Sequence, residues 1–366
     1  MIKLKFKEVR IIFINSFIFC EKMDLVKDFF NKIKTPKVVS IIGLAKNVSK
    51  TTTLNYIIRN IKENYVLGLT SIGRDGEKYD VITDLPKPQI YVKKGTYVVT
   101  ATQCSEDSKI KFTVIKNTGF NTPLGEIMIL KAQGDGYIEL AGPSINSQLK
   151  MICIELKKIG CDLILVDGAF DRRAYATPLI SDATIISTGA SVSRNMNEVI
   201  DLTIHTINLL NLKQEMNEEV INLSEEIMKK SKIGIINKSN SIKLLNVATA
   251  LDSVQDIIEN LDDDSKYIVI NGAITDKLLD GLMKTTQKHK ELAFLVDDGT
   301  KLFLSKNTLK KFQKMGGIIK VLKSINVFAV TINPTSPDGY EFDKAVFLKS
   351  LTDVLTIPVY NLGVND

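Results

Sequence analysis

The sequence predicts an α/β fold built around a mostly parallel sheet. Apolar runs of strand length alternate with helical patterns along most of its 366 residues, as they do where helices connect parallel strands. These runs are dominated by Ile, Leu and Val, which is typical of strands buried on both faces. A stretch from about 88 to 142 departs from this alternation and is predicted to be a β-rich insertion.

The insertion divides the first predicted domain, 23–211. Within it, short runs rich in β-branched and aromatic residues are separated by Gly, Asn and Pro, as in antiparallel hairpins. The elements predicted on either side are a strand at Val38–Ile42, a helix at Thr52–Ile61, a strand at Tyr65–Ser71, a helix at Gln148–Lys158, and strands at Asp162–Asp167 and Ala183–Thr188.

The pattern changes at a charged helical connector that begins near Leu212. Residues 212–366 are predicted to form a C-terminal α/β unit, which is either a second domain or an extension of the first sheet. Its predicted strands are Tyr267–Gly272, Leu292–Asp298, Val327–Asn333 and Ile357–Leu362.

Residues 1–22 combine basic residues with an apolar run from Ile11 to Cys20. The run is too short to span a membrane, and no small-residue cleavage site follows it. Met23 then opens an amphipathic helical pattern. We therefore expect 1–22 to be a non-native upstream extension, and the protein to be cytoplasmic with no membrane partner.

Composition narrows the possible functions. The net charge of +6 is modest for this length and the lysines are scattered, so no nucleic-acid partner is expected. The four cysteines lack close-paired ligand spacing, and reduced structural thiols in a cytosol are the simplest interpretation. With two histidines in the chain, a histidine-rich metal site is not expected.

The first strand leads into the loop GLAKNVSKTT and then a helix. Such a turn presents backbone N–H groups at a helix N-terminus, where an anion is favoured. Lys50 is placed to reach the β- and γ-phosphates of a nucleotide, and Thr51 to offer its hydroxyl to Mg²⁺. The predicted nucleotide-binding residues are Gly43, Lys46, Asn47, Val48, Ser49, Lys50, Thr51 and Thr52.

The loop departs from the strict phosphate-binding motif at two points. Five residues separate Gly43 from Ser49, where the strict motif has four, and Ser49 stands where that motif has Gly. Glycine has no side chain to obstruct the approach of phosphate to the backbone, so the serine either crowds the site or is accommodated. An ordinary strand–loop–helix with a capping Ser is the alternative.

Two carboxylates follow later strands of the predicted sheet. Asp75, in GRDGE, comes directly after Tyr65–Ser71, and Asp167 ends the apolar run LILVD. Carboxylates at the carboxyl edge of an α/β sheet can hold Mg²⁺ or orient an attacking water. Asp75 and Asp167 are therefore predicted to be catalytic and, with Thr51, to bind the metal. A polar turn at Asp75 and an acidic end to a buried strand at Asp167 are the alternatives.

Two further loops leave strand ends, at Ser187–Ser191 and Asn333–Gly339. Each could border a nucleotide base or a partner, and each is equally consistent with an ordinary turn.

Lys50-Thr51, Asp75 and Asp167 occur in the order found in P-loop nucleoside triphosphatases. The predicted fold is therefore a P-loop NTPase-like, mostly parallel sheet, and the predicted cofactors are ATP and Mg²⁺. The loop spacing favours the branch that includes dethiobiotin synthetase, MinD-like ATPases and metallochaperone GTPases. Lys46 precedes Lys50 by four residues, not the five of the second lysine in MinD-like loops, and is not assigned that role.

The segments GLAKNVSKTTTLNYII, LTSIGRDGE, ELAGPS and ILVDGAFDRRAYATPLISDATIISTGASVSRNMNEV together resemble the P-loop subunit of the lysine 5,6-aminomutase reactivase of bacterial lysine fermentation. The resemblance runs from about Met23 to the C-terminus. It implies an ATPase that, with a MutS-like reactivase subunit as partner, restores a lysine 5,6-aminomutase whose adenosylcobalamin has been damaged. It also implies that Lys50 and Thr51 carry nucleotide and Mg²⁺ binding. That family usually has Gly where Ser49 stands, which puts the hydrolysis rate in question more than the fold.

Two other functions stay open from the sequence. The loop spacing also suits an ATP-dependent ligase or small-molecule kinase of dethiobiotin synthetase-like type, which a phosphate-accepting substrate would accelerate. If Ser49 marks a lost enzyme, the chain is instead a non-hydrolysing nucleotide-binding regulatory module.

Overall fold

We describe the protein from a computed structural model, over residues 25–32, 37–72, 89–168, 177–178, 180–251, 253–285, 290 and 292–362. The chain divides into two compact units, which are described separately. The first unit comprises 1–169, 186–192 and 329–366, and the second comprises 170–185 and 193–328.

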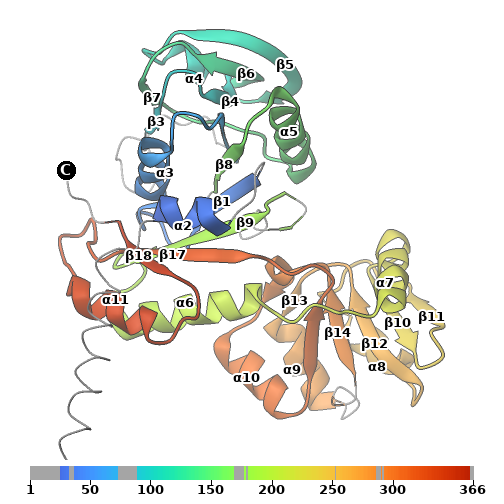
Figure 1. The fold of residues 1–366 in the computed structure, drawn as a ribbon. Coiled ribbons are helices and arrows are strands. Elements are labelled where there is room, and N and C mark those ends of the chain that lie inside the picture. The colour runs from blue at the N-terminus through green and yellow to red at the C-terminus, as the bar shows by residue number, and fades with distance from the viewer. Residues whose placement is uncertain are drawn as a thin grey trace, which may run out of the picture. The chain divides into compact units, whose positions relative to one another are not determined.

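A large mixed sheet runs through the first unit. In the described residues it has nine strands, in the order β18-β17-β9-β1-β8-β2-β4-β6-β5 (Figure 1). The pairs β1–β8, β8–β2, β2–β4 and β17–β18 are parallel, whereas β4–β6 and β6–β5 are antiparallel. The strands are β1 (Lys37–Gly43), β2 (Leu67–Ser71), β4 (Tyr97–Ala101), β5 (Phe112–Thr122), β6 (Gly125–Ala132), β8 (Leu163–Asp167), β9 (Ala183–Gly189), β17 (Val327–Asn333) and β18 (Val359–Asn361). The predicted α/β class with a mostly parallel sheet is therefore confirmed.

The central strands are apolar because both of their faces are covered. Residues 38–42 of β1 are all buried, as are the first four residues of β8. Parallel strands in this position need no alternation of polar and apolar residues. Lys37 opposes Leu163 and Ile41 opposes Asp167, so β1 and β8 end close together at one edge of the sheet.

The β-rich segment predicted at 88–142 is present, and three of its strands extend the large sheet. β4, β6 and β5 continue the sheet beyond β2. The remaining two strands, β3 (Ile90–Val92) and β7 (Gly136–Ile138), form a separate antiparallel pair.

The helices of the first unit include both of the helices that the sequence predicted there. α3 begins at Lys50, two residues before the helix that the sequence predicted. α5 covers the predicted Gln148–Lys158 and ends at Gly160, whose φ of 100° is one that glycine adopts readily. The bounds are α2 (Leu25–Lys32), α3 (Lys50–Asn60), α4 (Thr102–Glu106), α5 (Asn146–Ile159) and α11 (Lys344–Thr352).

The second unit is built on a smaller sheet, in the order β11-β10-β12-β14-β16. β10 is antiparallel to both of its neighbours, while β12, β14 and β16 run parallel. The bounds are β10 (Ile233–Asn237), β11 (Ile242–Leu245), β12 (Ser265–Ile270), β14 (Ala293–Val296), β16 (Ile318–Val321), the short pair β13 (Ile274–Thr275) and β15 (Leu302–Phe303), and the helices α6 (Met196–Leu210), α7 (Glu218–Lys230), α8 (Val254–Asn260), α9 (Asp276–Thr285), η3 (Gly299–Lys301) and α10 (Lys306–Lys314).

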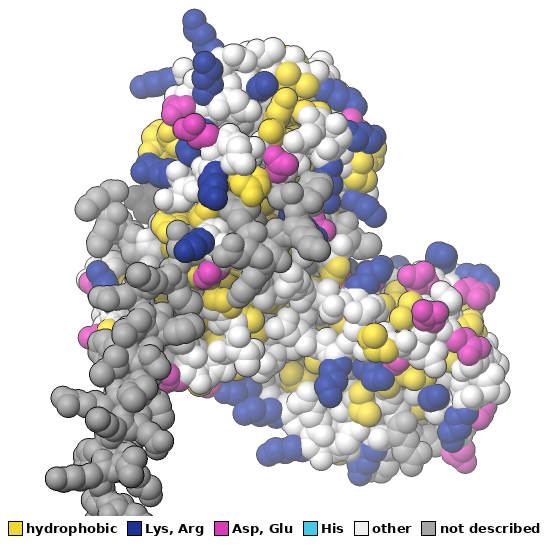
Figure 2. Space-filling model, in the orientation of Figure 1, with side chains coloured by type: hydrophobic (Ala, Val, Ile, Leu, Met, Phe, Trp, Pro, Cys, Tyr) yellow, Lys and Arg dark blue, Asp and Glu magenta, His cyan; other side chains and the backbone are white. Residues whose placement is uncertain are grey.

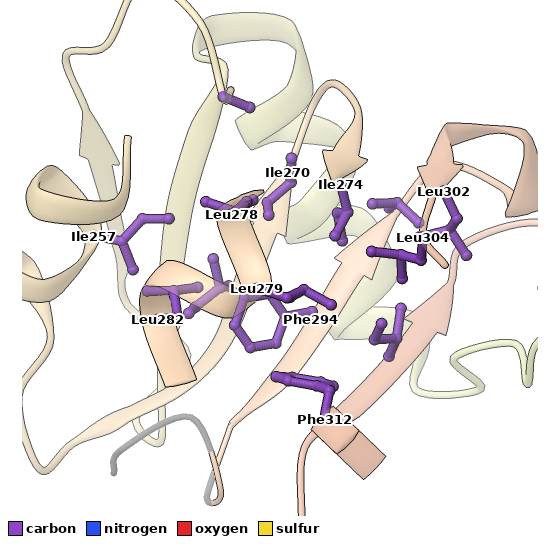
Figure 3. Close-up of a cluster of buried hydrophobic side chains, with 14 of the residues drawn as sticks. Ile257, Ile270, Ile274, Leu278, Leu279, Leu282, Phe294, Leu302, Leu304 and Phe312 are labelled. Atoms are coloured by element: carbon purple, nitrogen blue, oxygen red, sulfur yellow. The ribbon is translucent and has the colours of Figure 1, made fainter. Parts of the chain in front are cut away.

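Apolar side chains cover both faces of this smaller sheet. On one face, Phe294 meets Phe312 of α10 edge to face, with ring centroids 5.4 Å apart, among leucines of α9 (Figure 3). On the other face, Leu295 packs in a second cluster with Val220 and Ile227 of α7. Successive residues of β14 thus enter different cores, which is the alternation expected of a strand between two helix layers.

The division into units differs from the expected domains 23–211 and 212–366. After residue 328 the chain returns to the first unit, because β17 and β18 belong to the large sheet that contains β1. The alternation of strands and helices along a sequence does not depend on which sheet each strand joins, so the sequence pattern could not predict this return.

Within the described ranges, no helix combines the length and apolarity needed to cross a membrane.

Candidate functional site

The predicted loop follows the carboxyl end of β1, the strand that lies between β8 and β9 in the sheet. It connects the buried strand to α3 and contains residues 44–49. The N–H of Leu44 donates to the carbonyl of Ser187 on β9, over 3.0 Å. The loop therefore starts at the edge of the sheet where ligand sites of parallel α/β folds form.

Lys50 folds back across the start of this loop. Its Nζ donates to the carbonyl oxygen of Ala45 over 3.3 Å. A Cβ at Gly43 would lie 2.7 Å from that Nζ and 2.8 Å from Cγ2 of Val48. Gly43 is therefore the residue that leaves room for the lysine to turn back over the end of β1.

The position of Lys50 is electrostatically costly for an ammonium. Burial lowers the pKa of Lys50 below its ordinary 10.5, the Asp167 carboxylate opposes part of that effect, and Lys46 adds to it. A cation placed this way gains from any anion bound beside it, because the anion offsets the desolvation.

Ser49 adopts the left-handed backbone conformation, with φ 63° and ψ 32°. Asn47 does the same, with φ 58°. Asparagine is one of the few residues that visit this region readily, whereas serine has no such preference. The Ser49 side chain makes no capping hydrogen bond to α3, so the capping alternative is not what the structure shows. The motif's glycine is replaced at a position where the backbone itself favours glycine.

Asp167 ends β8 beside the loop. It opposes Ile41 of β1 on one side and Ser71 of β2 on the other. Gly168 follows, and its N–H donates to the carbonyl of Ile41 over 2.9 Å. A Cβ at Gly168 would lie 2.5 Å from that same oxygen, so a glycine is required where the chain leaves β8.

Three buried hydroxyl groups, those of Thr53, Thr331 and Ser187, lie together beneath the loop and contact it at Ser49. Oγ1 of Thr53 lies 2.9 Å from Oγ1 of Thr331, which lies 2.8 Å from Oγ of Ser187. Oγ1 of Thr53 also donates to the carbonyl of Ser49 over 3.1 Å. Sequence reasoning missed Thr53 and Thr331, whereas Ser187 begins the loop Ser187–Ser191 that the sequence offered as a border of a nucleotide base or a partner. The signal for Thr331 is a hydroxyl side chain within an otherwise apolar strand run, and the signal for Thr53 is one in the first turn of the predicted helix.

The two loops that the sequence offered as borders of a nucleotide base or a partner contact the loop that follows β1, at Asn47. Oγ of Ser191 donates to the carbonyl of Asn47 over 3.1 Å, and Nδ2 of Asn333 donates to the same oxygen over 3.3 Å. The N–H of Ala190 bonds the carbonyl of Asn333 over 2.9 Å, and the Tyr340 hydroxyl donates to the carbonyl of Ala190. The ends of β9 and β17 thus hold Asn47 in place.

The structure brings most of the predicted site residues to this one edge. Val48 has its side chain fully buried, so only its backbone can face a ligand. Lys46, Thr51 and Thr52 are half-buried, the last two in the first turn of α3. Asp75 lies outside the described residues, which resume at 89.

In the described part of the chain, no group of three or more His, Cys, Asp or Glu side chains is arranged to hold a metal ion. Oxygen donors suited to Mg²⁺ are nevertheless present at this edge, in the Asp167 carboxylate and the Thr51 hydroxyl.

No protein-family model matches the chain, and no curated protein or solved structure is significantly similar to it.

Proposed function

We propose that the loop from Gly43 to Thr52 is a P-loop that binds Mg-ATP, and that the chain is a P-loop ATPase. One observation carries the proposal: Lys50 is folded back over Gly43, where the parallel strands β1 and β8 end, and the Asp167 carboxylate acts on its charge. The first turn of α3 adds backbone N–H groups that have no intrahelical acceptor.

The residues present fit the nucleotide and its metal. A bound phosphate would offset the cost of burying the charged Lys50 ammonium. Carboxylate and hydroxyl oxygens are the ligands that Mg²⁺ prefers. Thr51 and Asp167 would hold the metal, which neutralises phosphate charge when bound. Lys50 would bind phosphate oxygens, and the hydrogen bonds on the Asn47 carbonyl would fix the loop around them.

We further propose the biological role implied by the resemblance. The ATPase would act as a cytoplasmic chaperone subunit that, with a MutS-like reactivase subunit, restores an adenosylcobalamin-dependent lysine 5,6-aminomutase by driving exchange of the damaged cofactor. Such a cycle needs loops that are ordered by bound triphosphate and released after hydrolysis, as in other nucleotide switches.

The nucleotide-binding step is tested with Lys50→Ala. Loss of charge-assisted contacts worth about 1.5–3 kcal/mol should weaken Mg-ATP binding roughly 10- to 150-fold. Folding should be retained, because the substitution removes a desolvated charge and not a core side chain. Isothermal titration calorimetry measures the affinity, and Lys62→Ala, at an exposed position of the same unit, is the matched control. Equal affinity for the Lys50→Ala and Lys62→Ala proteins would refute the P-loop assignment.

The role of Asp167 is tested separately with Asp167→Asn. The amide keeps the size of the side chain but loses the charge, so hydrolysis should fall more than binding if Asp167 positions the metal. Phosphate release and titration calorimetry on the same sample separate the two effects. Equal losses in both, or loss of folding, would make Asp167 a structural carboxylate.

The chaperone role is tested with an ATPase assay in the presence of lysine 5,6-aminomutase that has been inactivated by its substrate. Turnover should rise with the inactivated mutase and not with the intact one. A chain that hydrolyses ATP but ignores the mutase would keep the ATPase proposal and end the chaperone proposal.

A further inference from the structure

β5 is an edge strand of the large sheet. Among the described residues it pairs only with β6, on one side. It is 11 residues long, about twice the typical strand. An edge of this length presents a row of backbone donors and acceptors that another strand can use.

A register shift in β5 lies at two adjacent apolar residues. Val114 opposes Leu130 and Lys116 opposes Ile129, which leaves Ile115 as the extra residue of a bulge. Both side chains are exposed, Val114 at 55% and Ile115 at 42%.

A groove of about 220 Å³ lies beside the strand, between β5 and α5. Phe120 and Ile129 line it from the sheet, while Met151 and Ile154 line it from the helix. The two helix residues are 55% and 43% exposed, so the groove opens onto an apolar surface. Lys116 lies on this same face, because directly opposed residues of an antiparallel pair share a face and Lys116 opposes Ile129.

The charges at the groove favour an acidic occupant. Glu155 accepts hydrogen bonds from Lys116 over 2.6 Å and from Lys158 over 2.8 Å, which lowers the pKa of the carboxyl to about 2. Two ammonium groups therefore share one carboxylate, and a second carboxylate would complete the cluster. Figure 2 shows lysines and apolar side chains interspersed around this end of the sheet.

The same charges disfavour a second copy of this chain. Residues 108–122 contain Lys109, Lys111 and Lys116 and no Asp or Glu. Lys116 is the one charged residue within β5, and Lys109 and Lys111 precede the strand, so pairing β5 with another β5 would add lysines and no carboxylate from this segment. Lysine on an edge strand is a known device against such self-pairing.

We propose that the β5 edge and its groove dock an extended segment of a different protein that adds to the sheet as a strand beside β5. In this segment an apolar and an acidic residue stand two positions apart, so that both side chains face the groove. Backbone hydrogen bonds would supply affinity, the groove would take an apolar side chain, and Lys116 with Lys158 would select carboxylates. This inference does not depend on nucleotide binding.

The test uses the full chain and a defined probe. The probe is a fluorescein-labelled, end-capped octapeptide with threonine at every second position. The positions between hold valine and glutamate in turn, so that both lie on one face of the strand. Its binding is followed by fluorescence anisotropy. We expect saturable binding, at least tenfold weaker binding of the counterpart peptide with lysine in place of glutamate, and at least a tenfold loss with Val114→Glu/Ile115→Glu. Met151→Glu, which changes only the helix side of the groove, should weaken binding on its own.

Met216→Glu is the matched control, because Met216 is a 79% exposed apolar residue in the second unit. It should leave peptide affinity unchanged. No saturation at millimolar peptide, equal binding of the two peptides, or full affinity in the edge variant would overturn the proposal. A wild-type dimer in light scattering that Val114→Glu converts to monomer would overturn it as well, since a second copy would then cover the edge. Thermal melts establish that each variant is folded.

Discussion

Ser49 shows how one backbone angle changes the meaning of a motif position. The strict motif has glycine here, and the obvious concern is that a side chain crowds the phosphate. The structure gives a different reason for glycine, which is that φ at this residue is 63°. Serine can hold that conformation at a cost in free energy, so its presence does not by itself indicate a lost site.

Ser49→Gly should therefore stabilise the first unit. Relief of the left-handed strain, about 1–2 kcal/mol, is partly offset by the entropy that glycine loses on folding, about 0.5–1 kcal/mol. We expect a net gain of roughly 0.5–1 kcal/mol in the free energy of unfolding, measured by urea titration. Ser49→Ala is the control, since it removes the hydroxyl and keeps the Cβ. If alanine stabilises as much as glycine, the backbone angle is not the cause.

At the scale of elements, the connector 211–217 is held to β16 as an additional extended segment. The N–H of Glu215 donates to the carbonyl of Val321 over 2.9 Å, and the N–H of Val321 donates to the carbonyl of Lys213 over 3.1 Å. The Glu215 carboxylate is almost fully buried and pairs with Lys320 at 2.8 Å. Burial disfavours its charge, but Lys320 and the N–H groups of Asn217 and Met216 outweigh burial and hold its pKa below 4.5.

Glu215→Gln should destabilise the second unit by about 1–2 kcal/mol at pH 7, because it weakens a charge-assisted hydrogen bond in a buried position. The pH dependence follows from the lowered pKa. The carboxylate stabilises the fold above pH 4.5, and this contribution is lost as pH falls through the folded-state pKa. The difference between the variant and the wild type should therefore shrink in acid. Urea titrations at pH 7 and pH 3.5 measure this difference.

Glu226→Gln is the control for this substitution, because Glu226 pairs with Lys230 on the exposed side of α7. It should change stability by less than about 0.5 kcal/mol. A pH-independent deficit in Glu215→Gln would mean that shape, not charge, matters at that position.

The sequence predicted local elements better than their partners. β1, α3 and β8 were anticipated because each has a strong pattern of its own, with a buried run or a helical period. The partnership of Asn47 with Asn333 was not predictable, because it joins residues 286 positions apart through one side-chain amide. The left-handed angle at Ser49 was not visible either, since serine carries no signal for it.

At the scale of the whole molecule, the accessibility of the buried cysteines to a thiol reagent measures whether the first unit is folded. Cys104, Cys153 and Cys161 form no disulfide and all are buried. For Cys161, burial raises the pKa to about 12, with a further contribution from Asp162. Since the thiolate is the reactive form, these residues should be inert in the native state.

In a Cys20→Ser background, native protein at pH 8 should release almost no thionitrobenzoate from Ellman's reagent. Three equivalents should appear once the chain is unfolded in urea, because Cys104, Cys153 and Cys161 then become accessible. The rate in the native state should follow the rate of unfolding. A fast equivalent under native conditions would show that one of these thiols is reached without unfolding.

The hydroxyl contact between Thr53 and Thr331 also has a consequence for how the protein is made. The two residues are 278 positions apart, so at about 5–20 residues per second a ribosome needs roughly 14–56 s to add the second after the first. Asn333, which holds the Asn47 carbonyl, arrives later still. Throughout that interval the loop has been synthesised but β17, the strand that supports it, has not. The nucleotide-binding site proposed here is therefore complete only after β17 has been synthesised, and a nascent chain that stops before β17 would lack this support.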